Sequence, residues 1–251
     1  MRNLKILYKH RIKIKEVKAT VQNKLGSISF AFASFGGADI NYYLLQNKKR
    51  FAMMRLGITD IQKDNERPVL RFNKEKRLKK EFEAYSLGGP KGLTPNVIYF
   101  SSDVLVCEYL EGKRVFDILK QDKSQVWKIL IDATTLYQKL HVLNVVHLDA
   151  TLKNFVMVNS TMKVIDFEYY PAQRLTIETQ KAYDYVRIIE HTLRSVPMKY
   201  QNNFSLFIEH LDNIVPTSIR SADFSELRGL MDNIKTFPMY TQLKEQIFIN
   251  I

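Results

Sequence analysis

The strongest constraint on this chain comes from residues 145–170, which read V-V-H-L-D-A-T-L-K-N-F-V-M-V-N-S-T-M-K-V-I-D-F-E-Y-Y. His147-x-Asp149 is followed by Asn154, five positions after the aspartate. Two short apolar runs, 155–158 and 162–165, flank an Asn-Ser pair and predict a β-hairpin that leads into Asp166. A lone H-x-D is a weak signal, because short polar triplets often only turn or cap the backbone. The composite is far more specific, because the hairpin brings distant polar residues to one place.

These residue types suit phosphoryl transfer. The reaction needs a carboxylate beside the attacking hydroxyl, and oxygen ligands for magnesium ions that bridge the nucleotide phosphates. Asp149 can orient a hydroxyl group and accept its proton. Asn154 and Asp166 supply the oxygen ligands that Mg²⁺ requires. We expect His147 to hold the loop in shape and not to act as a catalyst.

The pattern resembles the protein-kinase-like phosphotransferase superfamily, whose catalytic loop reads H-x-D-x-x-x-x-N and whose metal loop begins with Asp-Phe. The resemblance extends over about residues 25–195. It implies an α+β, two-lobed fold with a β-rich N-terminal lobe and a mainly helical C-terminal lobe. It also implies ATP and Mg²⁺ as cofactors, Asp149 as the catalytic residue, and Asn154 and Asp166 as metal ligands.

The same resemblance implies a phosphate-binding cation in the first lobe. Arg55 occupies the place of the third-strand Lys of protein kinases, and Arg at this place looks like choline and thiamine kinases. A guanidinium can bind phosphate bidentately. Glu81 is the first candidate for the helix carboxylate that holds Arg55, and Glu83 is the second. The alternative is that Arg55 is an exposed cation at the end of a strand.

Two further segments are expected to contact the nucleotide. Gly36 and Gly37 lie where the phosphate-covering loop belongs, but the full G-x-G-x-x-G is absent, so a simple tight hairpin is an equal alternative. The run C-E-Y-L-E-G at 107–112 looks like the hinge, where the backbone of Glu108 and Leu110 would bind adenine. These features predict an N-terminal lobe over 1–107, a hinge over 108–112 and a C-terminal lobe over 113–251.

The apolar patterns predict the elements of each lobe. Alternation of Ile with Arg and Lys at 11–15 indicates a strand, and 27–33, 41–45 and 50–56 predict the three strands of an antiparallel meander. Residues 73–87 predict one exposed helix capped by Asn73 and closed by Gly88-Gly89-Pro90. A hairpin of 96–100 and 104–109 completes a five-stranded sheet. Helical spacing then predicts helices at the following ranges: 126–140, 181–195, 204–214 and 224–234.

Positive charge is concentrated near the N-terminus. The 251 residues carry 38 Lys and Arg against 26 Asp and Glu, a net charge of +12. Residues 1–80 hold 20 basic and 6 acidic side chains (+14), which leaves 18 and 20 (−2) for residues 81–251. This excess favours an anionic partner such as phosphorylated ligands, a membrane surface or nucleic acid. A solvated Lys-rich face is the simpler alternative, and for a charge run alone it is the favoured one.

Composition also bears on location. The single Cys107 excludes an intramolecular disulfide and fits a reducing compartment. No apolar run approaches the roughly 20 residues of a membrane span, and the basic N-terminus lacks the apolar region of a signal peptide. We expect a cytoplasmic protein, with peripheral contact at the inner face of a membrane.

The metal loop points to an atypical branch. Asp166-Phe167-Glu168 replaces Asp-Phe-Gly, no A-P-E follows, and Thr151 stands where Ser/Thr protein kinases usually carry Lys. I-D-F-E-Y-Y is similar to choline and ethanolamine kinases, as part of the choline and aminoglycoside kinase group. The following Y-P-A-Q-R and K-A-Y-D-Y-V-R look like lipopolysaccharide core kinases and RIO-type atypical kinases.

The expectation is therefore a kinase that phosphorylates a hydroxyl of a glycan or small molecule, with a lipopolysaccharide-core sugar as the first choice. Three alternatives stay open within the superfamily: a choline-kinase-like enzyme for small alcohols, an atypical Ser/Thr protein kinase, and a catalytically weak kinase-fold module that regulates a partner. A plain RNA-binding protein is less favoured, since no RNA-recognition motif is present.

Overall fold

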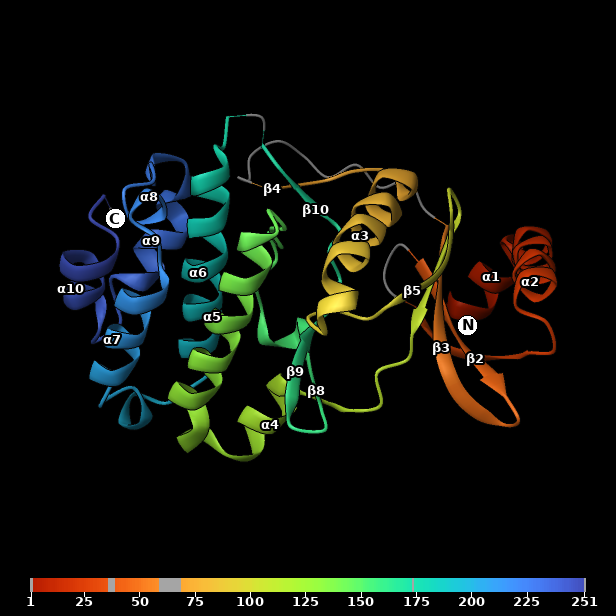
Figure 1. Cartoon of the computed structure of the whole chain (residues 1–251), viewed down its shortest axis with the longest axis horizontal. Helices are drawn as coiled ribbons and strands as arrows, with labels where there is room; N and C mark the ends of the chain where they lie inside the picture. Colours follow the sequence, from red (N-terminus) through yellow and green to blue (C-terminus); the bar gives the residue numbers. More distant parts are fainter. Residues whose placement is uncertain (1, 36–38, 59–68, 173, 251) are drawn as a thin grey trace. The chain divides into compact units, whose positions relative to one another are not determined.

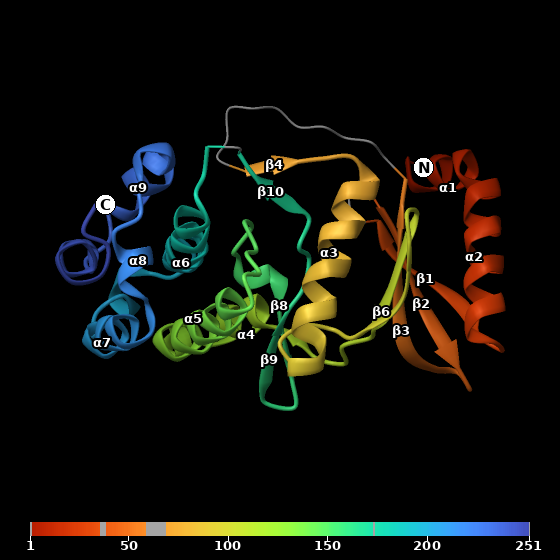
Figure 2. The ribbon, with the colours of Figure 1, turned by 45° about the horizontal axis from the view of Figure 1, so that its top comes forward.

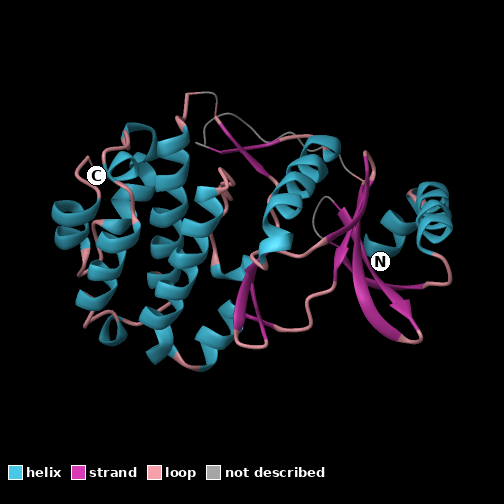
Figure 3. Ribbon diagram, in the orientation of Figure 1, coloured by secondary structure: helices cyan, strands magenta, loops and turns pink. Residues whose placement is uncertain are grey.

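The structure is a computed structural model that describes residues 2–35, 39–58, 69–172 and 174–250. The chain divides into two units, one formed by residues 1–63 and 71–111 and the other by residues 64–70 and 112–251. The five-stranded sheet lies in the first unit, and helices make up most of the second (Figure 3). The expected α+β architecture, with a sheet-rich N-terminal part and a helical C-terminal part, is therefore confirmed.

An antiparallel sheet in the order β1-β2-β3-β6-β5 forms the centre of the first unit. The turn between the second and third strands places Asn47 and Lys48 at φ 50° and 64°, the left-handed geometry that a two-residue hairpin favours. The predicted five-stranded sheet is confirmed with small shifts at the strand ends. Its strands are β1 (Ser29–Phe35), β2 (Asp39–Gln46), β3 (Lys49–Gly57), β5 (Val97–Ser101) and β6 (Val104–Glu108).

The predicted strand at residues 11–15 is wrong, because two helices, α1 (Arg2–Lys9) and α2 (Arg11–Leu25), precede the sheet. Ile14, Val17 and Val21 are three and four residues apart and form a helical stripe buried against the sheet core. Alternation over five residues was too short a window to outweigh this longer period. Figure 2 shows α2 running along the side of the sheet opposite to α3.

Helix α3 (Lys74–Gly88) begins at Asn73, whose side chain accepts the Lys76 N–H at 3.0 Å, so the predicted cap is confirmed. The helix is not simply exposed: Leu78, Ala84 and Tyr85 are buried. A short 3-10 turn, η1 (Gly89–Lys91), follows it.

The second unit is built on long helices, of which α5 and α6 lie side by side (Figure 1). The predicted helices at 126–140, 181–195 and 204–214 are confirmed, whereas 224–234 divides into a 3-10 turn and a shorter helix. The helices are α4 (Val115–Gln121), α5 (Val126–Val142), α6 (Ile177–Leu193), α7 (Ser205–Ile214), α8 (Thr217–Arg220), α9 (Arg228–Ile234) and α10 (Tyr240–Gln242). Among the described residues, no helix is long and apolar enough to cross a bilayer.

Strands and short turns complete the second unit. The predicted hairpin is confirmed as β8 and β9, with Asn159 and Ser160 at φ 46° and 66° in its turn. Strand β10 forms a two-stranded sheet with β4. The first two residues of β4, Val69 and Leu70, belong to the second unit. The strands are β4 (Val69–Arg71), β7 (Lys113–Arg114), β8 (Phe155–Val158), β9 (Thr161–Val164) and β10 (Tyr169–Pro171). The turns are η2 (Lys123–Gln125), η3 (Leu152–Asn154), η4 (Met198–Tyr200), η5 (Ser225–Leu227) and the π-turn η6 (Leu243–Ile247).

Because His191 on α6 is partly buried, we expect the free energy of unfolding to fall in acid. Burial, and after it the charge of Arg187, lower the pKa of His191 from 6.5 to about 4. Below about pH 6.5 the unfolded chain therefore binds a proton that the folded chain does not, and the free energy of unfolding falls as the pH falls toward 4. We expect His191→Gln to lose less stability than the wild type between about pH 7 and pH 5. Urea denaturation at both pH values tests this, and equal losses would contradict it.

Candidate functional site

The loop that contains Asp149 is fixed by a buried carboxylate on α6. Asp184 is completely buried, and it accepts the backbone N–H groups of His147 at 2.8 Å and Leu148 at 2.7 Å. The imidazole Nε2 of His141 lies 3.1 Å from the same carboxylate. Leu148 has φ 66°, a strained conformation for a branched residue, which these contacts hold in place.

Asp184 lies within the predicted helix 181–195, and no role was predicted for it. The available signal was a single acidic residue inside the apolar run A-Y-D-Y-V-R-I-I, where burial of a charge requires partners.

His147 holds two segments of the loop together. Its Nδ1 accepts the backbone N–H of Asp149 at 3.1 Å, so the ring proton lies on Nε2, which donates to the Ile165 carbonyl at 2.9 Å. The ring is fully buried, with its centroid 4.6 Å from that of Phe167. These contacts give His147 a structural role, and its ring has no exposed edge for catalysis.

Asp149 and Asn154 are joined directly. The Asn154 Nδ2 donates to the Asp149 backbone carbonyl at 3.0 Å and to its carboxylate Oδ2 at 3.1 Å. Burial raises the pKa of Asp149, and the nearby charge of Asp166 raises it further, while His147 and the Asn154 hydrogen bond oppose this. Because both amide protons of Asn154 serve Asp149, the amide oxygen is the Asn154 atom that can ligate a cation.

The β8–β9 hairpin brings Asp166 to the same place. The Ile165 N–H donates to the Asn154 carbonyl at 2.9 Å, which fixes the residue before Asp166 against the residue before β8. Asp166 itself has φ 74°, an unusual conformation for a non-glycine residue. The three residues predicted for catalysis and metal binding are thus neighbours in the second unit.

The donor set suits Mg²⁺. It combines a carboxylate with an amide oxygen, both hard oxygen ligands, and the two repelling carboxylates of Asp149 and Asp166 would be stabilised by a cation. Within the described part of the chain, no three His, Cys, Asp or Glu side chains form a metal-binding group. Magnesium sites that use one or two carboxylates, waters and substrate phosphates do not need such a group.

In the first unit, Arg55 on β3 belongs to a network of buried charges. Its Nη1 pairs with Glu81 Oε2 on α3, and its Nε lies 3.4 Å from Asp39 Oδ2 on β2. Arg77 Nη2 pairs with the other Asp39 oxygen at 2.8 Å. The expected Arg55–Glu81 contact is formed, whereas Glu83 is exposed and lies 3.9 Å from Lys79. Asp39 and Arg77 were not identified from the sequence.

Tyr85 fixes the second oxygen of Glu81. Its hydroxyl donates to Glu81 Oε1 at 2.6 Å, and burial raises the pKa of Tyr85 well above its usual value, so the hydroxyl keeps its proton. Burial also raises the pKa of the neighbouring Cys107 thiol, so the thiolate, the reactive form, is suppressed. Glu81 is therefore held through both oxygens.

The other predicted nucleotide contacts stay predictions. Gly36 and Gly37 lie outside the described residues. Glu108 ends β6, and its N–H donates to the Asn96 carbonyl at 2.8 Å while its carboxylate accepts the Asn96 Nδ2 at 3.0 Å. Leu110 follows β6 in a segment without regular structure.

Removing the Arg55 guanidinium should affect both stability and nucleotide use. We expect Arg55→Ala to lower the free energy of unfolding by about 3 kcal/mol, because it removes the cation that pairs with the buried Glu81 carboxylate, and to raise the KM for ATP. Denaturant unfolding and initial rates at varied ATP measure the two effects. Lys49→Ala is the control, since Lys49 is an exposed cation on the same strand. If both variants behave like the wild type, Arg55 is only a strand-end cation.

Comparison with known proteins finds a distant similarity to a protein kinase. No protein-family model matches the chain. An alignment 161 positions long, which covers 57% of this chain, is 26% identical to the mitosis inhibitor protein kinase SWE1 of Candida albicans. The matched region spans only 14% of that relative's length. This distant similarity supports a kinase-like fold.

Proposed function

We propose that this chain is an ATP- and Mg²⁺-dependent phosphotransferase that moves the γ-phosphate to a hydroxyl group. The observation that carries the proposal is the arrangement in which Asp149 and Asn154, on a loop anchored by Asp184, lie beside Asp166 at the end of the β8–β9 hairpin. This arrangement offers a proton acceptor beside hard oxygen ligands, which are the groups that phosphoryl transfer needs. The similarity to a protein kinase supports the same class of reaction.

The roles follow from the chemistry of the residues. Asp149 orients the acceptor hydroxyl and accepts its proton. At the same time the hydroxyl oxygen forms a bond to the γ-phosphorus. The bond between that phosphorus and the bridging oxygen breaks, and ADP is released. Asn154 and Asp166 would hold Mg²⁺, which when bound neutralises charge on the phosphates. Arg55, oriented by Glu81, would bind phosphate oxygens. Gly36 and Gly37 would cover the phosphates, and the backbone of Glu108 and Leu110 would bind adenine.

For the acceptor we propose a glycan or small molecule, with a lipopolysaccharide-core sugar as the first choice. Three features support it: the Asp-Phe-Glu metal loop, the short segment between Asp166 and α6, and the basic N-terminal region that suits a phosphorylated acceptor. A small alcohol such as choline, or a Ser or Thr hydroxyl of a protein, is the alternative acceptor.

The test is phosphate transfer by the purified full chain from labelled ATP, with Mg²⁺ or with a chelator. The acceptors are lipopolysaccharide, choline, monosaccharides and a mixed protein substrate. We expect Mg²⁺-dependent transfer to one of them, and we expect Asp166→Ala to abolish it because a metal ligand is lost. Asp117→Asn, an exposed aspartate at the start of α4, is the control and should keep full activity. Binding of ATP without turnover or transfer to any acceptor would exclude the enzyme.

One observation favours a second candidate, a kinase-fold module that binds nucleotide without transferring phosphate. Arg55 contacts two carboxylates, those of Glu81 and Asp39, so its positive charge is already compensated before any phosphate binds. In this case ATP should raise the unfolding temperature of the wild type. The ATP hydrolysis rates of the wild type and of Asp166→Ala should both equal the background rate.

A further inference from the structure

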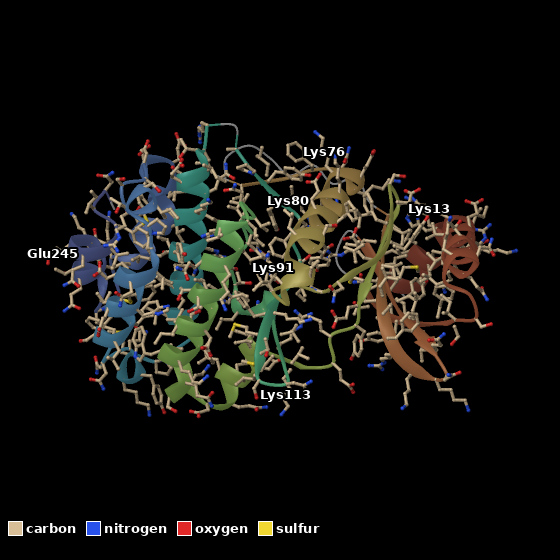
Figure 4. All side chains as sticks on the ribbon, viewed as in Figure 1. Lys13, Lys76, Lys80, Lys91, Lys113 and Glu245 are labelled. Carbon is tan, nitrogen blue, oxygen red and sulfur yellow. The ribbon has the colours of Figure 1, made fainter. Side chains whose placement is uncertain are left out.

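The first two helices hold more than half of the net charge of the whole chain. Residues 2–25 contain eight Lys and Arg against the single Glu16, a net charge of +7 in a protein of net charge +12. Not every cation is available for a partner: Lys13, labelled in Figure 4, pairs with Asp103, which also lies 3.0 Å from Lys74. The remaining exposed cations are therefore the ones that can contact an anionic partner.

Burial of one face of α2 fixes which side chains face solvent. Ile14, Val17 and Val21 pack on the sheet, so the helical period places Ile12 and Ala19 on the opposite side, with Lys15 beside them. Ile12 is 65% exposed, so its apolar side chain is open to solvent. Two cations, Arg11 and Lys15, stand beside this apolar residue.

The end of α1 extends the same surface. Tyr8 is 68% exposed, and the Arg11 guanidinium lies 4.2 Å from the centre of its ring while its Nη1 donates to the Tyr8 carbonyl at 3.0 Å. Lys9 is exposed, and together with Ile12 it lines a pocket between α2 and the turn at Asp103. Two exposed apolar side chains thus have cations beside them, and the exposed Glu16 lines the same pocket as Ile12. We call Tyr8, Lys9, Arg11, Ile12 and Lys15 the α1–α2 surface.

A groove of about 620 Å³ adjoins this surface, with Arg11, Lys15 and Lys18 among its lining residues. The Lys18 Nζ lies 3.8 Å from the centre of the Tyr42 ring and 5.3 Å from that of Phe30. Burial lowers the pKa of Lys18, so its ammonium group gains from an anion placed beside it. Because the ammonium already lies over both rings, a nucleobase would have to displace it in order to stack on them. The groove therefore favours a compact anionic group over a nucleic acid base.

We infer that the α1–α2 surface docks on an anionic lipid bilayer, with Tyr8 and Ile12 entering the interface and Lys9, Arg11 and Lys15 contacting lipid phosphates. Charge complementarity supports the bilayer, since basic side chains near an anionic membrane surface each contribute to binding. The exposed apolar pair supports it over purely electrostatic partners, because interfacial helices combine a cationic rim with inserted apolar side chains. The docking needs no nucleotide. The inference is therefore independent of the proposed phosphotransferase activity.

The charge component is tested by sedimentation with vesicles of phosphatidylcholine, alone or mixed with phosphatidylglycerol, in the absence of ATP. We expect the full chain to bind only the mixed vesicles, and added salt to weaken binding. The triple variant Lys9→Gln, Arg11→Gln, Lys15→Gln should bind about 100-fold more weakly, at about one kcal/mol for each cation. A matched triple variant replaces three exposed lysines of the second unit and should bind like the wild type: Lys139→Gln, Lys199→Gln, Lys244→Gln.

The apolar component separates a membrane from a nucleic acid. Ile12→Ser should weaken vesicle binding about tenfold through loss of apolar burial. Leu206→Ser, which alters an apolar side chain on α7 that is 73% exposed, should change nothing. Equal binding to both vesicle types, no binding at all, or equal loss in the two triple variants would overturn the inference. So would tight binding of single-stranded RNA that the Lys9, Arg11 and Lys15 changes abolish and Ile12→Ser leaves unchanged.

Discussion

Replacing Asp149 with asparagine should lower kcat for phosphate transfer by about 10²–10⁴-fold, the range that a positioned acid or base contributes. The amide has nearly the same shape and can still accept the hydrogen bond that Asn154 Nδ2 donates, so the loop should keep its conformation. The amide cannot accept the proton of the attacking hydroxyl. The ATP dissociation constant, measured by calorimetry, should change little, because Asp149 is not expected to hold the nucleotide.

The control for this prediction is Asp117→Asn, which makes the same chemical change at an exposed position. Its kcat and its unfolding temperature should equal those of the wild type. If Asp149→Asn keeps the wild-type kcat, Asp149 is not the proton acceptor. If it loses ATP affinity in step with kcat, its role is in binding.

Asp184→Ala should strongly destabilise the second unit. It removes the acceptor of two buried backbone N–H groups, those of His147 and Leu148, and a partner of His141. Each buried donor left unsatisfied costs about 1–3 kcal/mol, so we expect a loss of about 3 kcal/mol or more. For a chain of this size that corresponds to an unfolding temperature lowered by about 6–12 °C.

Phosphate transfer by Asp184→Ala should fall further than the folded fraction does, because the strained Leu148 conformation depends on this acceptor. Activity is therefore measured at a temperature where circular dichroism shows the variant folded. Asp184→Asn, which keeps an oxygen acceptor, should recover part of both losses. A thermal unfolding curve of Asp184→Ala that matches the wild type would show that the loop holds its shape without this carboxylate.

The residues around the hairpin were predictable because the relevant information is local. Asn154 and Asp166 stand at the two ends of one strand-turn-strand unit, so their proximity follows from hairpin geometry and the Asn159-Ser160 turn. The Asn73 cap is local in the same way, since the side chain bonds a backbone N–H three residues later. The misplaced strand at 11–15 shows the limit of this reasoning: the alternation was local, but the helix is stabilised by burial against strands that come later in the sequence.

The contacts that the sequence left unidentified join residues far apart in the chain. Asp184 bonds Leu148 across 36 positions, and Arg77 bonds Asp39 across 38. Nothing in the spacing of such residues predicts the pairs. The Asp184–Leu148 distance depends on how α6 packs within the second unit, and the Arg77–Asp39 distance depends on how α3 packs within the first unit.

The sequence by itself determined the chemical groups of the candidate site and the hairpin that gathers Asn154 and Asp166, since a period of two and a turn dipeptide act over a few residues. Only the tertiary structure decided that Asp184 anchors the loop, that Asp39 shares Arg55 with Glu81, and that the basic first residues are helices on the sheet. Each of these depends on burial, and burial is set by elements that pack together from distant parts of the chain.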